Sequence, residues 1–167
     1  MGDLLSTTSI GPRRGLLRAR TAHDWYERGL ALEDTAPDQA IAAYRRALLG
    51  RADLADAHNN LGRLLHDKGE LKLAESHYRL ALTCDREVAL YWFNLGVVVE
   101  DRGRIDDAIE SYQQALALDP ALVDAHFNVA RLYEQLGRSS HDELMLRRAI
   151  RHLADYRRLA ASSASAR

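Results

Sequence analysis

Apolar residues recur at spacings of three and four along most of the chain after residue 20, which is the pattern of amphipathic α-helices. The stretch "YWFNLGVVVEDRGR", residues 91–104, shows this pattern clearly and has Gly96 in its middle. A glycine inside a helix costs about 1 kcal/mol relative to alanine, so its presence needs a reason. Short polar turns that contain Gly69 and Gly103 predict that helices end there and that new ones begin almost at once.

Small residues recur in equivalent helical settings at a nearly fixed period. Gly29, Gly62 and Gly96 are followed by Ala130, and successive members of this series are 33, 34 and 34 residues apart. Such a period predicts repeated helical hairpins. Each of the three glycines precedes an alanine, a tyrosine four residues later and a second alanine three further on, which share one helical stripe. These trios are Ala40, Tyr44, Ala47; Ala74, Tyr78, Ala81; and Ala108, Tyr112, Ala115.

The two series together predict close contact between the paired helices. We expect each small residue to let the first helix of its hairpin approach an alanine of the second helix. Packing between the two backbones would then offset the helix propensity that glycine loses. The expected pairs are Gly29–Ala40, Gly62–Ala74, Gly96–Ala108 and Ala130–Ala149.

The repeated pattern resembles that of the tetratricopeptide repeat (TPR) family over about residues 22–137. The third copy has the landmarks Trp92, Leu95, Gly96, Gly103, Ala108, Tyr112, Ala115 and Pro120. The resemblance implies an all-α fold, an α-α superhelix in which about four helical hairpins form a right-handed solenoid with a long C-terminal helix. The first copy departs from the family at Arg28, where an apolar residue is usual, and the fourth is interrupted after Gly137. The expected repeats are residues 22–54, 55–88, 89–122 and 123–160.

In TPR proteins the first helix of every hairpin lines the concave side of the solenoid. The resemblance therefore implies a groove for a peptide or protein segment, with the partner-binding residues on the first helices. They are Tyr26, Asn59, Asn60, Arg63, His66, Phe93, Asn94, Val97, Phe127, Asn128 and Arg131.

Asn60, Asn94 and Asn128 form a ladder with one member per repeat. An asparagine side chain has both a donor and an acceptor, so a row of them can bind the backbone of an extended peptide without dictating its sequence. The same amides can instead hydrogen-bond neighbouring helices, and the two interpretations are compatible.

Some TPR domains hold the C-terminal carboxylate of a chaperone with a clamp of lysine, arginine and asparagine. Here Leu90 and Asn94 stand where the third repeat of such a clamp needs lysine and arginine. Moving the register by one repeat puts Asp124 and Asn128 there instead, so chaperone-tail binding is disfavoured. The cations that can meet carboxylates of another partner are Arg63, His66 and Arg131.

The end of the chain predicts one long helix from about His141 to Ala160. We expect its apolar stripe to pack on the fourth hairpin and its arginines to face solvent, as the last helix of a solenoid requires. Residues 1–20 are expected to be mobile or to form a short cap before the solenoid of residues 21–160, and residues 161–167 to form a disordered tail. The stripe consists of Leu144, Ile150, Leu153 and Tyr156.

The charge balance argues against two classes of partner. With 23 basic and 24 acidic residues the net charge is −1, whereas direct binders of nucleic acid or anionic membranes carry a basic excess. No apolar run approaches the roughly 20 residues that span a bilayer. The single cysteine, Cys84, stands where the repeat favours a buried apolar residue, and it fits a reducing cytoplasm.

No motif of a catalytic, metal or cofactor site is present. The seven histidines invite a metal hypothesis, yet no HExxH or CxxC spacing occurs. His58 and His126 instead occupy the position that Trp25 and Trp92 fill in the other copies. We therefore expect no metal, no cofactor and no enzymatic activity.

The sequence favours a cytoplasmic, non-enzymatic protein that binds a peptide or protein segment in the concave groove. Two alternatives stay open. One is a self-associating scaffold, a homo-oligomer in which an end of the solenoid or the C-terminal helix docks on another copy. The other is a regulatory subunit of a bacterial transcription or signalling system, because "NLGRLLHDKGELKLAESHYRLAL" and "FNLGVVVEDRGR" resemble the TPR portion of some MerR-type regulators.

Overall fold

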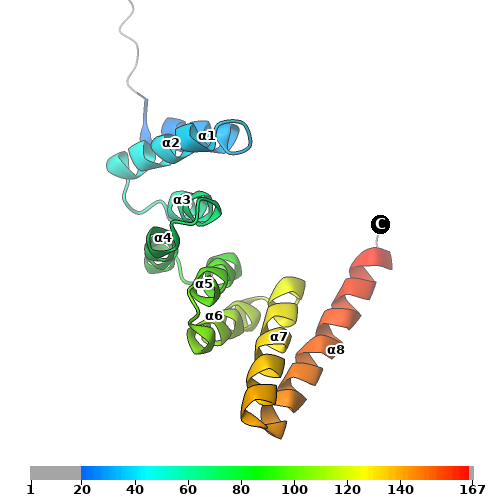
Figure 1. Ribbon diagram of the computed structural model, residues 1–167. Helices are drawn as coiled ribbons and strands as arrows, with labels where there is room; N and C mark the ends of the chain where they lie inside the picture. The colour runs from blue at the N-terminus through cyan, green and yellow to red at the C-terminus, as the bar shows by residue number, and fades with distance from the viewer. Residues whose placement is uncertain (1–19, 166–167) are drawn as a thin grey trace, which may run out of the picture.

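The computed structural model describes residues 20–165, and this part of the chain forms eight α-helices and no strand (Figure 1). Consecutive helices pair as four hairpins, and the hairpins stack in chain order, with α2 on α3, α4 on α5 and α6 on α7. The predicted all-α solenoid is confirmed. The helices are α1 (Ala22–Leu32), α2 (Pro37–Gly50), α3 (Ala55–Asp67), α4 (Leu71–Cys84), α5 (Ala89–Asp101), α6 (Ile105–Leu118), α7 (Val123–Ser140) and α8 (Glu143–Ser165).

Local sequence explains where several helices begin and end. Gly69 and Gly103 both adopt a φ of 76°, the left-handed conformation that favours glycine just after a helix. Thr21 and Asp24 form a capping box at the start of α1, in which each side chain accepts a hydrogen bond from the backbone N–H of the other. Pro37 opens α2, where its missing N–H removes no helical hydrogen bond. The two predicted glycine turns are confirmed.

The repeated glycines are needed because tyrosine rings occupy the space of a side chain. A Cβ added to Gly29 would lie 2.5 Å from Cε1 of Tyr44, and one added to Gly96 would lie 2.6 Å from Cδ1 of Tyr112. Both tyrosines are fully buried, so neither ring has free space to move into. The third pair, Gly62 and Tyr78, repeats the contact at 2.9 Å.

The close approach predicted from the glycine series is therefore confirmed, and the atoms nearest to Gly29 and Gly96 belong to tyrosine rings and not to Ala40 and Ala108. Only Gly62 has its expected partner among its nearest neighbours, with Ala74 O 3.3 Å from the added Cβ. Alanine and tyrosine lie on the same helical stripe, four residues apart. Their spacing does not tell which of them lies over the glycine.

The fourth hairpin is longer than the other three (Figure 1). α7 continues past Gly137, and His141 then takes a left-handed conformation with φ 56° before α8 begins. The interruption after Gly137 is thus mostly an extension of α7. α8 continues to Ser165, whereas a disordered tail was expected from residue 161. Residues 1–19, which include most of the expected N-terminal cap, lie outside the described residues.

Two expectations about burial are wrong. Leu144 and Ile150 were expected to pack on the fourth hairpin, but they are 59% and 67% exposed. Met145 and Ala149 face the core in their place. Cys84, expected to be buried, is exposed at the last position of α4, where the helix has already passed the core.

Candidate functional site

The eleven predicted partner-binding residues all lie on the first helices of the hairpins. Tyr26 is on α1, and the α3 helix carries the largest group. These helices follow one another at intervals of one hairpin, so equivalent positions form rows along the solenoid. The α3 group is Asn59, Asn60, Arg63 and His66; the α5 group is Phe93, Asn94 and Val97; and the α7 group is Phe127, Asn128 and Arg131.

The asparagines form a chain of hydrogen bonds that crosses between hairpins. Asn94 Nδ2 donates to Asn59 Oδ1 at 2.8 Å, and Asn59 Nδ2 donates to Asn60 Oδ1 at 3.2 Å. Asn60 Nδ2 is in turn 3.4 Å from the hydroxyl of Tyr44 on α2. Asn59 is buried, whereas Asn60 and Asn94 are partly exposed. The amides therefore join neighbouring helices, and Asn59 can influence a ligand only through the two that reach the surface.

Glu33 is the centre of a polar cluster at the junction of the first two hairpins. The Tyr44 hydroxyl donates a hydrogen bond to the Glu33 carboxylate. Arg63 Nη2 donates to the same carboxylate from α3, at 2.5 Å. Burial, followed by the hydrogen bond to Glu33, raises the pKa of Tyr44 well above its usual value, so the phenol stays protonated as a donor. The charge of Arg63 is thus already balanced within the chain.

The same cluster recurs between the third and fourth hairpins. The Tyr112 hydroxyl donates to Glu100 at 3.0 Å, and Arg131 of α7 donates to the other Glu100 oxygen. Burial and the charge of Glu100 raise the pKa of Tyr112, while a hydrogen bond with Asn128 opposes the shift. A carboxylate of a partner would have to share Arg131 with Glu100.

The junction between the second and third hairpins has different chemistry. His66 occupies the position of Glu33 and Glu100, and its Nε2 lies 2.6 Å from an Asp101 carboxylate oxygen on α5. Val97 replaces the arginine of the other two junctions. This middle part of the row is consequently less polar than its two ends.

Aromatic side chains of the predicted site lie against the second helices. The ring centroids of Tyr26 and Tyr44 are 5.8 Å apart, and those of Phe93 and Tyr112 are 5.6 Å apart. Phe127 lies 5.3 Å from Tyr156 but remains 44% exposed. Phe127 is therefore the predicted aromatic residue that is most available to a partner.

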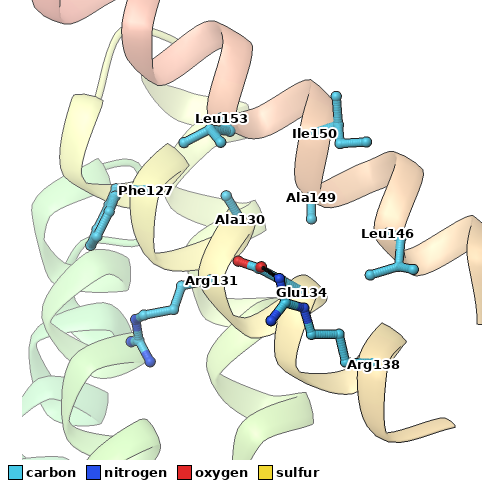
Figure 2. A pocket seen from close by; sticks show the side chains of 9 residues that line it. All are labelled: Phe127, Ala130, Arg131, Glu134, Arg138, Leu146, Ala149, Ile150 and Leu153. Carbon is cyan, nitrogen blue, oxygen red and sulfur yellow. Dashed lines mark ion pairs between the residues drawn. The ribbon is translucent and has the colours of Figure 1, made fainter. Parts of the chain in front are cut away.

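A pocket of about 500 Å³ opens between α7 and α8 beside Phe127 and Arg131 (Figure 2). Its floor includes Ala130 and its α8 side includes Leu146, Ile150 and Leu153, as the side chains in Figure 2 show. The α8 residues of this pocket were not among the predicted partner-binding residues. The register of Ile150 could have indicated these residues, because Ile150 follows Ala149 as Ile41 follows Ala40.

Histidine pairs replace the tryptophan in the second and fourth hairpins. His58 Nε2 lies 3.1 Å from the carbonyl oxygen of Ala52, and because a carbonyl only accepts, this nitrogen carries the proton. Its Nδ1 therefore accepts from Nδ1 of His77, 3.0 Å away. Burial, then the neighbouring His58 and Arg45, lower the pKa of His77 to about 4. Burial lowers the pKa of His58 as well.

The fourth hairpin repeats this arrangement with different residues. His126 Nε2 lies 3.0 Å from the carbonyl oxygen of Pro120, and its Nδ1 lies 3.0 Å from Nδ1 of His152. Burial, followed by the charge of His126, lowers the pKa of His152. In the third hairpin, the indole N–H of Trp92 donates to a carbonyl in the corresponding turn at 2.9 Å. Both pairs are therefore structural links between a hairpin and the turn before it.

Neither a metal centre nor a membrane span emerges from the described residues. Within residues 20–165, no three histidine, cysteine or acidic side chains are grouped so that they could hold a metal ion. Over the same range, every helix is too short or too polar to cross a bilayer.

Solved structures with the same fold include several of MamA. A crystal structure of MamA superposes with a TM-score of 0.77 at 20% identity, over 86% of this chain and 81% of that chain. MamA from residue 41 to its end, from Desulfovibrio magneticus RS-1, gives a TM-score of 0.72 at 20% identity, over 84% and 76%. The first TPR of Spaghetti (RPAP3), bound to the HSP90 peptide SRMEEVD, gives 0.67 at 19% identity, over 70% and 94%. At these identities the similarity shows the fold alone.

Family models place these helices in a known class of repeat. A comparison with curated proteins gives no match. A model described as tetratricopeptide repeat matches residues 30–89, and one described as TPR repeat matches residues 101–137. Because the two matches together cover more than half of the chain, and its hairpins keep the period of the repeat, the chain belongs to the tetratricopeptide repeat family.

Proposed function

We propose that the chain binds an extended segment of a partner protein along the row of its first helices, and that it does so without catalysing a reaction. The observation that carries this proposal is the exposure of apolar side chains next to amides on adjacent first helices. Phe93 is followed by Asn94 on α5, and the more exposed Phe127 is followed by Asn128 on α7. Apolar contacts would supply the affinity, and the amides would hydrogen-bond the partner backbone.

The fold itself supports this function. The first TPR of RPAP3 has the same fold and is bound to a peptide, so a solenoid of this kind accommodates a peptide. The proposal does not extend to chaperone tails, because Leu90 and Asn94 stand where a carboxylate clamp needs cations. The groove arginines moreover already pair with Glu33 and Glu100.

A triple variant tests the groove. Phe93→Ala, Asn94→Ala and Asn128→Ala together should reduce capture of the native partner from an extract of the source organism by more than about tenfold. Wild-type protein and the variant are compared by quantitative mass spectrometry of the captured proteins. Circular dichroism checks that the variant remains helical.

The matched control replaces exposed leucines on second helices. Leu49 on α2 and Leu80 on α4 are 88% and 44% exposed, so Leu49→Ala with Leu80→Ala should leave both capture and fold unchanged. If the folded triple variant retains the same partner as wild type, the partner does not bind in the groove.

A further inference from the structure

The α7–α8 hairpin has a mostly apolar surface that we call the end face, formed by Phe127, Ala130, Glu134, Leu146, Ile150 and Leu153. It surrounds the pocket of about 500 Å³ shown in Figure 2. The end face goes beyond the proposed groove, since half of it belongs to a second helix, α8. Equivalent surfaces of the earlier hairpins are covered by the next hairpin.

Ile150 occupies a position that is buried in every earlier hairpin. Ile41, Glu75 and Ile109 each follow the first alanine of their trio, and they are 6%, 6% and 8% exposed. The next hairpin packs against each of their helices. Ile150 is 67% exposed, and no helix of the described chain follows α8. Within residues 20–165, the end face is thus a junction surface that no following helix covers.

Glu134, the acidic residue of the end face, also lacks the ion-pair partner that its counterparts find on a following hairpin. Glu33 and Glu100 each pair with an arginine from the following hairpin, whereas Glu134 pairs with Arg138 of its own helix at 2.5 Å. Leu153 stands where the earlier hairpins have a tyrosine. Its smaller side chain fills less space over Ala130, which leaves the pocket open.

A second copy of the chain is a poor occupant for this surface. In a head-to-tail stack, α1 of the second copy would take the place of α3, α5 or α7. Its Arg28 stands in register with Leu61, Leu95 and Val129, which are 0%, 2% and 0% exposed. Burying this arginine without a partner would carry a large desolvation cost. α1 therefore carries a charge at a position that the stacked helices α3, α5 and α7 bury.

The charge of α8 indicates what kind of helix the end face accepts. This helix has five arginines against two acidic residues, and the two acidic side chains, Glu143 and Asp155, pair with Arg147 and Arg158. Arg157 stands in the position of Leu48, Leu82 and Leu116, all of which are partly buried and pack against the core. An incoming helix would therefore meet a positive charge where the earlier junctions are apolar.

We propose that the end face binds an amphipathic helix of a partner protein, with an apolar stripe over Ile150 and Leu153 and acidic side chains opposite Arg157. A helix is expected because α3, α5 and α7 fill the three equivalent positions. Acidic side chains are expected opposite Arg157, because this exposed cation continues the stripe of Ile150 and Leu153 on α8.

Two synthetic peptides test this proposal on the full chain. The probe is a fluorescein-labelled peptide of about 20 residues with leucines at helical spacing and glutamates flanking them; its control has lysines in place of the glutamates. Fluorescence anisotropy should show that the acidic peptide binds at least about tenfold more tightly than the basic one. Equal affinities for the two peptides would overturn the proposal.

Variants place the binding on the end face. Ile150→Glu should weaken binding of the acidic peptide by at least about tenfold, whereas Leu144→Glu, on the same helix but outside the pocket, should leave it within about twofold. Arg157→Glu should remove the preference for the acidic peptide. Unchanged binding by Ile150→Glu would contradict the proposal.

Two further measurements separate this inference from its alternatives. The groove variant with Phe93→Ala, Asn94→Ala and Asn128→Ala should bind the acidic peptide like wild type, so failure of the groove proposal leaves this test intact. Sedimentation analysis should show no dimer that Ile150→Glu dissociates. Such a dimer would mean that a second copy covers the end face, and the proposal would be wrong.

Discussion

Replacing Gly96 by leucine should lower the free energy of unfolding by about 3 kcal/mol or more. A Cβ at this position would lie 2.6 Å from two carbons of the Tyr112 ring, and that ring is fully buried and hydrogen-bonded to Glu100. The leucine must therefore push α5 away from α6 or expel the tyrosine. Urea unfolding followed by circular dichroism measures the change.

The fourth hairpin supplies the matched control. Ala130 occupies the same position, but Leu153 replaces the tyrosine and the pocket lies beside it. Ala130→Leu should therefore change stability by less than about 1 kcal/mol. In the third hairpin, Gly96→Ala combined with Tyr112→Leu reproduces the Ala130–Leu153 pair and should be more stable than the two separate effects predict. Equal losses for Gly96→Leu and Ala130→Leu would refute the packing explanation.

The fold was predictable because the same sequence pattern recurs in successive hairpins. The glycine series and the alanine–tyrosine trios fixed the number of hairpins and the helices to which they belong. What the spacing could not tell was which side chain covers each glycine, because Ala108 and Tyr112 lie on one stripe of α6 and differ only in reach. The extension of α7 to Ser140 was hidden by the polar run after Gly137, which is compatible with either a loop or a helix end.

The site was only partly predictable, for a related reason. The repeat register placed the asparagines and aromatics on the first helices. The hydrogen bonds between hairpins, however, depend on how the hairpins pack against one another. No sequence pattern says that Asn94 donates to Asn59, or that Arg63 already has a carboxylate partner. Ile150 was assigned to the core because it continues an apolar stripe. Its exposure depends on the absence, in the described chain, of a helix after α8.

Acidification from about pH 7 to about pH 5 should destabilise the protein through the His58–His77 pair, by roughly 1–2 kcal/mol. The pKa of His77 is lowered to about 4 in the folded chain, while an unfolded histidine titrates near 6.5. The unfolded state therefore binds more protons in this interval. The contribution of the neutral pair to stability is fully present above about pH 6.5. It falls as the pH drops and is lost once the pH passes below the pKa of the folded state.

The geometry of the second hairpin explains why protonation of His58 or His77 is unfavourable. His58 already uses Nε2–H on the Ala52 carbonyl, so a proton on its Nδ1 would face the N–H of His77. Arg45 adds positive charge next to His77. Because the two rings are coupled, the loss belongs to the pair and not to either residue.

The third hairpin provides a replacement that removes the titration. Trp92 and Ser111 occupy the two positions there, and Trp92 keeps the hydrogen bond to the preceding turn. His58→Trp with His77→Ser should therefore reduce the loss between about pH 7 and about pH 5 by the contribution of one pair. Carboxylates titrate mostly below this interval, so they contribute little to the difference. An identical pH dependence in the double variant and in wild type would show that the His58–His77 pair is protonated without cost.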